Sequence, residues 1–377
     1  MTGSDGAHGA AGPGDPGHGQ GPARGKIRVR VGTEADREAW DAWVAALPSA
    51  DPLQAWDWGT VAATGSERPV RLVATDEAGR VRGVAQVLVR DTAAGRRVLY
   101  VPHGPAWETD AADGPAVLAA LLGALRDLGR AERGIVLKFD PRATADVPAA
   151  EIRSQVLRQG ARMARADLQA VTTRVIDLRP GPGQLLAGLE KDTRNLVRRS
   201  AREGVRPRVV RGADRAAYSA FADLLAATGQ RAGFRVRPRA AFEAIGATFA
   251  SRGDACLVLA ELAGRPIAGC LALVAGRRAY YLYAASVRAP ELRHAAGPYA
   301  ALWACIEALA ADGLESLDLW GVAEPGDPAA DPAWAGFSLF KRGFGGALLR
   351  HPGTFDLVLA RGWYAIRDLR ERLGLRI

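Results

Sequence analysis

The order of apolar and polar residues separates a short segment without periodicity from a long segment that predicts folded structure. Residues 1–26 are rich in Gly, Ala and Pro and show no apolar period, which predicts a disordered tail. Apolar residues alternate with Arg over 27–31 and predict a strand, and Thr33 is a suitable N-cap for a helix that runs to about Leu47. Folded structure is therefore expected from Ile27 onward.

The first half continues with a hairpin, a strand, a helix and another strand. Two runs of apolar residues flank the turn-forming sequence Glu77-Ala78-Gly79 and predict the hairpin. The expected elements are strands at 70–75, 81–89, 97–101 and 135–139 and a helix at 114–132. Helices interspersed with strands in this way are typical of a mixed α/β layer.

The second half repeats this order of elements. A hairpin around the turn at 262–265 is followed by a strand, a helix that opens at Gly297-Pro298-Tyr299, and a strand at 316–320. Corresponding landmarks lie about 180 to 185 residues apart, which indicates an internal duplication. The second copy carries an insert at about 182–252, where the pattern predicts a helix, a strand and two helices.

These patterns predict an α/β fold with mixed sheets, built from two similar lobes. We place the first lobe at 27–168 and the second at 169–377, where a strand at 173–178 opens the second lobe. Two lobes of the same construction leave a cleft between them, which is a common place for a ligand.

Composition changes this picture only a little. Lys+Arg number 50 against 41 Asp+Glu, a formal charge of +9, but Arg is so abundant that much of this excess is compositional. The three cysteines have apolar neighbours and no metal-ligand spacing, so we expect reduced core thiols and no metal. No apolar run approaches the roughly 20 residues of a membrane span. These observations predict a cytoplasmic protein, and the scarce lysines are Lys26, Lys138, Lys191 and Lys341.

The helix expected at about 182–203 carries cations on one face. Lys191, Arg194, Arg198 and Arg202 recur at i, i+3, i+7 and i+11, which places them on the same side of a helix. Guanidinium groups bind phosphate oxygens in pairs, so this face is suited to phosphate recognition. The alternative is a solvated helix face in an Arg-rich protein.

Two further segments combine cations or phenols with places that a ligand could reach. Arg231–Arg239 form a cationic loop between two expected helices, which is either a binding loop or ordinary surface. Tyr281 and Tyr283 fall on one face of the strand at 279–284, where they either orient a substrate or pack into the core.

The segment from Phe337 to Gly346 contains the most suggestive lysine. Lys341 lies between Phe340 and a Gly-rich bend, and glycines allow a backbone to approach a ligand closely. An ammonium group held near apolar groups could stabilise an oxyanion in acyl transfer, whereas the alternative is a surface lysine in a turn. The sequence has no G-x-S-x-G, Walker A or Cys/His nucleophile pattern. This favours direct attack by one substrate on another.

At this point the chain resembles the FemABX family of tRNA-dependent aminoacyl (peptidyl) transferases, over about 27–369. The motif Phe340-Lys-Arg-Gly-Phe-Gly345, with the basic helix upstream, is the most specific. The other matching segments are Leu53-Gln-Ala-Trp-Asp-Trp-Gly59, Tyr100-Val-Pro-His-Gly-Pro105, Lys191-Asp-Thr-Arg-Asn195, Arg202-Glu-Gly-Val205, Tyr283-Ala-Ala-Ser286 and Leu319-Trp-Gly321.

The resemblance implies two lobes related to the GCN5-type acetyltransferases (GNAT fold). It implies an aminoacyl-tRNA donor and an amine acceptor on a peptidoglycan precursor, either UDP-MurNAc-pentapeptide or lipid II, so that the product is an interpeptide bridge. No cofactor, no metal and no DNA are implied. A peripheral contact with membrane-bound lipid II is consistent with this reading, and a monomer is the default expectation. The coiled-coil arm of some members is not expected, because Gly229, Gly233 and Pro238 interrupt the segment.

The resemblance also implies roles for single residues. It makes Lys341 the catalytic lysine that contacts the reacting carbonyl, and it assigns substrate or tRNA contacts to its neighbours. Those contacts are assigned to Trp58, Gly104, Arg194, Arg198, Tyr283 and Phe340 for substrate and to Lys191 and Arg342 for tRNA. Trp58 and Gly104 would form the first-lobe wall of the acceptor cleft. Glu108, Asp110 and Asp318 are candidates for a general base by residue type only.

One departure leaves the acceptor open. Some members have a lysine shortly after the tryptophan motif that binds the nucleotide diphosphate of the acceptor, whereas Thr60-Val-Ala-Ala63 contains none. A lipid-linked precursor or a small amine of antibiotic biosynthesis therefore remains an alternative. A CoA-dependent N-acyltransferase ranks lower, because the loop at 293–299 keeps one glycine and Pro298 removes a donor N–H. An RNA-binding module that uses only the basic face would leave Lys341 unexplained.

Overall fold

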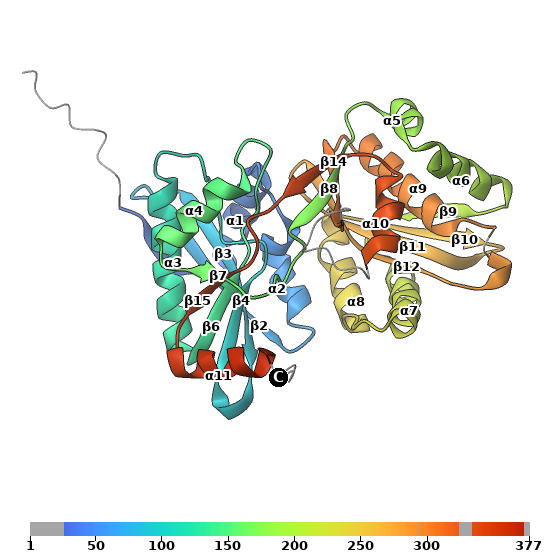
Figure 1. The fold of residues 1–377 in the computed structure, drawn as a ribbon. Coiled ribbons are helices and arrows are strands. Elements are labelled where there is room, and N and C mark those ends of the chain that lie inside the picture. Colours follow the sequence, from blue (N-terminus) through green and yellow to red (C-terminus); the bar gives the residue numbers. More distant parts are fainter. Residues whose placement is uncertain (1–25, 293, 324–333, 373–377) are drawn as a thin grey trace, which may run out of the picture.

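A computed structural model describes residues 26–292, 294–323 and 334–372 of the chain. The predicted disordered tail at 1–26 thus lies outside the described residues, except for Lys26. Two mixed sheets, each covered by helices on both faces, lie side by side in Figure 1. Within the described part of the chain, no helix combines the length and the apolar composition needed to cross a membrane.

The first sheet has the strand order β1-β2-β3-β4-β6-β15-β7, with the short β5 paired to β3. Its strands are β1 (Arg28–Val31), β2 (Glu67–Thr75), β3 (Val81–Asp91), β4 (Arg97–Val101), β5 (Ala106–Trp107), β6 (Gly134–Phe139), β7 (Arg162–Met163) and β15 (Phe355–Val358). The helices are α1 (Arg37–Ala46), α2 (Trp56–Ala62), α3 (Gly114–Ala131), α4 (Ala149–Arg158) and α11 (Arg361–Arg372). Alternate residues of β2 pack on opposite faces: Leu72 lies in the core with α3, and Val73 lies in the core with α1.

The second sheet has the order β14-β8-β13-β12-β11-β10-β9. Its strands are β8 (Thr172–Asp177), β9 (Arg206–Val210), β10 (Ala255–Leu262), β11 (Arg265–Ala275), β12 (Arg278–Ser286), β13 (Ser316–Gly321) and β14 (Ala347–Arg350). The helices are α5 (Pro182–Gly188), α6 (Lys191–Arg202), α7 (Arg215–Ala232), α8 (Arg239–Ala247), α9 (Gly297–Ala311) and α10 (Ala335–Arg342). The three cysteines are free and buried in this lobe, as expected.

The two sheets confirm the predicted duplication. Each contains an antiparallel hairpin (β2–β3 and β10–β11), then a strand, a crossover helix (α3 and α9), and a last strand parallel to the one before the helix. The flanking strands also correspond. Strand β1 borders the first hairpin as β9 borders the second, and β15 lies antiparallel beside β6 as β8 lies antiparallel beside β13.

The chain end departs from the predicted division into lobes. We assigned 169–377 to the second lobe, but β15 pairs with β6 and β7 of the first sheet. Two contacts between distant parts of the chain hold β15 there. Phe355 stacks on Phe139 with ring centroids 5.4 Å apart, and the Lys138 ammonium donates to the Asp356 carboxylate at 2.7 Å. Strand β15 thus crosses over and completes the sheet of the first lobe, whereas β8 lies in the second sheet as predicted.

The basic segment is two helices rather than the single helix that we predicted. Helix α5 ends at Gly188, Leu189 is extended with ψ 148°, and α6 begins at Lys191. The Arg194 guanidinium donates to the carbonyl oxygens of Ala187 and Leu189 at 2.7 and 3.1 Å, so it satisfies the open end of α5. Helix α7 has 18 residues and α8 has 9, and both pack into one core, so no coiled-coil arm is present among the described residues.

The lobes contact each other through apolar and polar groups. Residues of α2 and of the turn before it pack into the core that α7 and α8 form with the second sheet, namely Leu53, Trp58 and Val61. The Arg142 guanidinium of the first lobe donates to the Asp318 carboxylate of β13 at 2.7 Å, and both side chains are buried. Sequence analysis did not predict α2.

Candidate active site

The site is a cavity that opens where β12 and β13 separate. These parallel strands pair only from Arg278 to Tyr280, opposite Ser316 to Asp318, although β12 continues to Ser286. In the first lobe the corresponding strand β4 pairs with β6 along its whole length. The open backbone edges of β12 and β13 border a cavity of about 710 Å³, which α7 and α10 also line.

Lys341 lines this cavity and is almost completely buried. Its side chain is 8% exposed, and its ammonium donates to the carbonyl oxygen of Gly321 at 2.7 Å, just after the point where the strands part. The ammonium also lies 5.0 Å from the ring centroid of Phe337. Burial lowers the pKa of Lys341 to about 8, and the nearby Asp318 carboxylate only partly opposes this effect. A buried ammonium of this kind is a strong electrostatic group at neutral pH.

Two aromatic residues predicted for the site also line the cavity. Phe340 and Tyr283 are both among its lining residues. Phe340 packs edge-on against Tyr299 with ring centroids 5.0 Å apart, and burial raises the pKa of Tyr299. Burial likewise raises the pKa of Tyr283, so its hydroxyl stays protonated at neutral pH. The structure therefore brings Lys341, Phe340 and Tyr283 together in one cavity.

Three arginines face the same space. Arg235 and Arg237 belong to the cationic loop between α7 and α8, and Arg288 follows β12. The Arg237 guanidinium lies 4.9 Å from the ring centroid of Trp58, and it carries an ion pair with Glu67 at 3.5 Å. The cationic loop is therefore part of the cavity wall. Arg288 was missed because it belongs to no recognisable motif in the sequence. Trp320 lies in the matching segment Leu319-Trp-Gly321, but no role at the site was assigned to it.

Trp58 reaches the site from the first lobe but does not line the cavity directly. Its ring is buried beneath Arg237, and no described residue accepts a hydrogen bond from its indole N–H. Gly104 is buried against Gln54, and an added Cβ would lie 2.6 Å from the Gln54 carboxamide. Gly104 therefore has a packing constraint of its own, and its predicted contact with substrate stays a prediction.

The basic helix α6 meets the end of α10 beside the cavity. The Glu190 N–H donates to the carbonyl oxygen of Gly343 at 3.0 Å, and Gly343 lies so close to Thr193 that a Cβ would clash. Arg342 lies 3.5 Å from the Glu190 carboxylate. Lys191 and Arg198 are exposed on α6, whereas Arg194 is half-buried and hydrogen-bonded to α5. The structure thus places Lys191 and Arg342 where α6 and α10 meet, but it gives Arg194 a structural partner.

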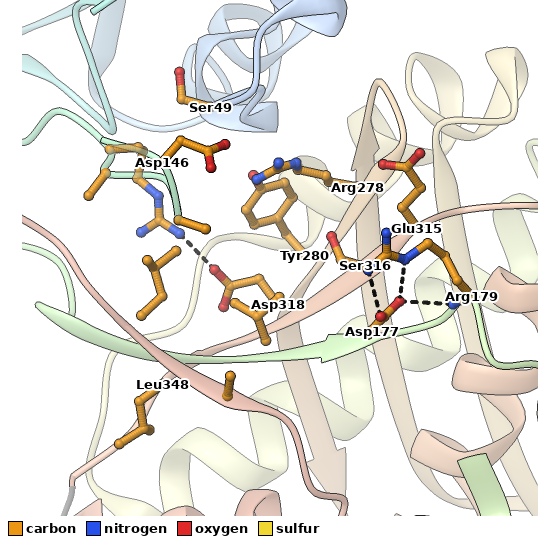
Figure 2. A pocket seen from close by; sticks show the side chains of 16 residues that line it. Ser49, Asp146, Asp177, Arg179, Arg278, Tyr280, Glu315, Ser316, Asp318 and Leu348 are labelled. Atoms are coloured by element: carbon orange, nitrogen blue, oxygen red, sulfur yellow. Dashed lines mark hydrogen bonds and ion pairs between the residues drawn. The ribbon is translucent and has the colours of Figure 1, made fainter. Parts of the chain in front are cut away.

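A second cavity, of about 410 Å³, lies between the lobes. Figure 2 shows Arg278, Tyr280 and Asp318 facing this cavity across from Ser49 and Asp146 of the first lobe. Asp318 is 5% exposed and accepts hydrogen bonds from Arg142, Thr173 and its own neighbour Trp320. The other two candidate bases are farther from this chemistry, because Glu108 pairs with Arg82 at 3.3 Å and Asp110 is exposed. None of the three lines the larger cavity.

Comparisons with known proteins agree with this architecture. A model described as "Acetyltransferase (GNAT) domain" matches residues 189–336. Lipid II:glycine glycyltransferases are similar in sequence: that of Staphylococcus haemolyticus (strain JCSC1435) is 29% identical over 239 residues, which are 60% of this chain and 54% of the relative. The Staphylococcus aureus protein is 29% identical over 232 residues, covering 59% and 53%. The chain thus spans about half the length of the curated relatives that it matches.

Solved structures match over nearly the whole fold. The crystal structure of FemX covers 90% of this chain and 99% of its own, with a TM-score of 0.76 and 21% identity. A tandem GNAT protein from the clavulanic acid biosynthesis pathway covers 89% and 99%, with a TM-score of 0.54 and 14% identity. The fold therefore defines the class, a protein of two tandem GNAT-type lobes. Within that class, the sequence and structure matches together confirm the resemblance to the FemABX family.

Proposed function

We propose that this protein transfers an aminoacyl group from aminoacyl-tRNA to an amine of a peptidoglycan precursor and so builds an interpeptide bridge. The observation that carries the proposal is the buried Lys341 ammonium in a cavity with three arginines, at the opening between β12 and β13. The similarity to lipid II:glycine glycyltransferases supports an acceptor of this class. The donor is a cytoplasmic molecule, so the proposal includes a cytoplasmic location.

In the proposed reaction the acceptor amine attacks the ester carbonyl carbon that joins the amino acid to the tRNA ribose. A C–N bond forms, the C–O bond to the ribose breaks, the amine loses a proton and the ribose oxygen gains one. The intermediate carries a negative oxygen between these events. Lys341 donates one N–H to Gly321, and among the described residues no other group accepts from it, so its remaining N–H donors can serve that oxygen.

The cations around the cavity would hold the phosphate groups of the substrates. Arg235, Arg237 and Arg288 present planar donors that match phosphate oxygens. Lys191, Arg198 and Arg342 would extend this field along α6 toward the tRNA, whereas Arg194 would act mainly by joining α5 to α6. Tyr283, Phe340 and Trp58 would bound the space in which the amine and the ester meet.

The acceptor that we favour is the lipid-linked precursor. The segment 60–63 has no lysine for a nucleotide diphosphate, and the sequence relatives are named for lipid II. The cavity cations could hold the diphosphate of such a precursor instead.

The test is a transfer assay with labelled aminoacyl-tRNA, in which lipid II, UDP-MurNAc-pentapeptide and small amines are offered separately. We expect label to appear on lipid II and to vanish when RNase is added first. The variant Lys341→Met should lose transfer, and Lys26→Met, which removes an exposed lysine, should not. Transfer that survives RNase or needs acyl-CoA would exclude the proposal, and transfer only to a small amine would replace the acceptor.

A further inference from the structure

Helix α11 turns its apolar side toward solvent. Trp363, Ile366 and Leu369 recur every three residues on one side of the helix, and they are 36%, 52% and 56% exposed. An ordinary surface helix places such a stripe against the core. Figure 1 shows α11 lying across one end of the first sheet, at the edge of the molecule.

The opposite, polar side of α11 attaches the helix to the protein. The Tyr364 hydroxyl donates to the Asp356 carboxylate of β15 at 2.6 Å, and the Arg162 guanidinium of β7 lies 4.0 Å from the Tyr364 ring centroid. Asp368 pairs with Arg165 at 4.0 Å and with Arg372 at 2.8 Å. Because these contacts fix the rotation of the helix, the exposure of the apolar stripe is a consequence of the fold.

Cations border this apolar stripe. Arg370 is exposed and follows Leu369 directly. The Arg96 guanidinium lies 5.2 Å from the ring centroid of Trp363, at the stripe itself. Arg133 is also exposed, and its guanidinium lies 4.0 Å from the position of an added Cβ on Gly95, the residue before Arg96. The one acidic side chain described on α11, Asp368, already has two cationic partners.

We propose that the outward face of α11, formed by Trp363, Ile366 and Leu369 with the adjacent arginines, binds peripherally to an anionic lipid bilayer. A helix with an apolar stripe, an aromatic residue and basic flanks lies in the interface of such a membrane. Its arginines are attracted to the negative surface potential of the lipid headgroups.

Two observations favour a bilayer over a second copy of the chain. A stable dimer buries about 800 Å² on each partner, and three side chains on one helix fall well short of that area. In addition, two identical faces would bring Arg370 of both copies together, and like charges repel at an interface. An anionic membrane offers the opposite charge and accepts a shallow apolar stripe.

This inference does not depend on the proposed reaction, because membrane binding can be measured without donor or acceptor. The experiment is cosedimentation of the whole protein with vesicles of phosphatidylcholine, alone or with about 30% phosphatidylglycerol. We expect at least tenfold tighter binding to the anionic vesicles, and a loss of most of that binding when salt is raised from about 0.05 M to about 0.5 M.

The variants compare α11 with equally exposed positions elsewhere. The double variant Ile366→Ser/Leu369→Ser should bind the anionic vesicles at least tenfold more weakly, and Arg370→Glu should also weaken binding. The matched controls, Val31→Ser/Leu157→Ser and Arg265→Glu, should bind like the unmodified protein, because those side chains are exposed on other surfaces. Circular dichroism would confirm that each variant is folded.

Two results would overturn the inference. One is binding by the α11 double variant within twofold of the unmodified protein. The other is light scattering that shows self-association of the unmodified protein, abolished in the double variant, because the stripe would then be covered by a second copy.

Discussion

Replacement of Lys341 by Met tests, without any substrate, whether burial in the cavity lowers the pKa of this lysine. Burial lowers the pKa of Lys341 from 10.5 to about 8, and the difference of about 2.5 corresponds to about 3 kcal/mol, because one pKa unit is about 1.4 kcal/mol. The unfolded chain keeps its proton up to about pH 10.5, whereas the folded protein loses it above about pH 8. The unfolded state therefore binds more protons within this window, and the free energy of unfolding rises with pH there.

The variant Lys341→Met has no such proton, so the comparison with it isolates this effect. Met also leaves the Gly321 carbonyl without its donor and removes the contact with Phe337, but those losses change little with pH. We expect the free energy of unfolding of the unmodified protein, relative to that of the variant, to rise by about 2 to 3 kcal/mol between pH 7 and pH 10. Urea unfolding at the two pH values measures this difference.

The matched control is Lys26→Met, because Lys26 is exposed and its loss should leave the difference constant across the same pH range. A constant difference for Lys341→Met as well would refute the reasoning, since it would mean that the ammonium is not desolvated in the folded protein. In the transfer assay, loss of an oxyanion donor of this kind typically costs a factor of about 100 to 1000 in kcat. The two measurements together separate the cost of burying Lys341 from its use in catalysis.

Two further predictions concern other charged groups. Arg237→Ala should raise KM for the phosphate-bearing substrate about tenfold, with a smaller effect on kcat. The control Arg265→Ala, at an exposed turn, should change neither constant. Steady-state kinetics in which both variants give the same KM would contradict this role of Arg237. Burial raises the pKa of Asp140 to about 6, so the folded state holds a proton that the unfolded state releases near pH 4, and stability falls as the pH rises from 4 to 6. Asp140→Asn should flatten that slope in urea unfolding, and an unchanged slope would exclude Asp140 as its origin.

The features that sequence analysis predicted depend on short-range patterns. Strand alternation, the turn at Glu77-Ala78-Gly79 and the Gly-Pro helix starts at 114–115 and 297–298 are each readable within about ten residues. The hairpins, crossover helices and last strands of both lobes therefore agree with the structure. Lys341 was a candidate because a rare lysine beside glycines is also a local pattern, and the family resemblance added its role.

The features that it missed depend on contacts between distant residues. The pairing of Asp356 with Lys138 joins positions 218 residues apart, so no local pattern indicates that β15 enters the first sheet. The break between α5 and α6 was hidden because Leu189 and Glu190 are compatible with a helix by propensity alone. The cavity itself results from the separation of β12 and β13. The sequence of a strand does not show at which residue its pairing with the neighbouring strand ends.

The two copies differ in how far their parallel central strands stay paired, and they contribute differently to the site. In the first lobe, β4 and β6 stay paired to their ends, and Val101 and Phe139 are buried there in the core. The first lobe contributes to the site from outside the cavity, because Trp58 lies beneath Arg237 and Arg142 binds Asp318. Because the Arg142–Asp318 pair is buried, loss of either partner would leave an uncompensated charge, which typically costs about 3 to 5 kcal/mol. Such a cost would hold the lobes in one fixed arrangement, and the packing of Trp58 beneath Arg237 requires that arrangement.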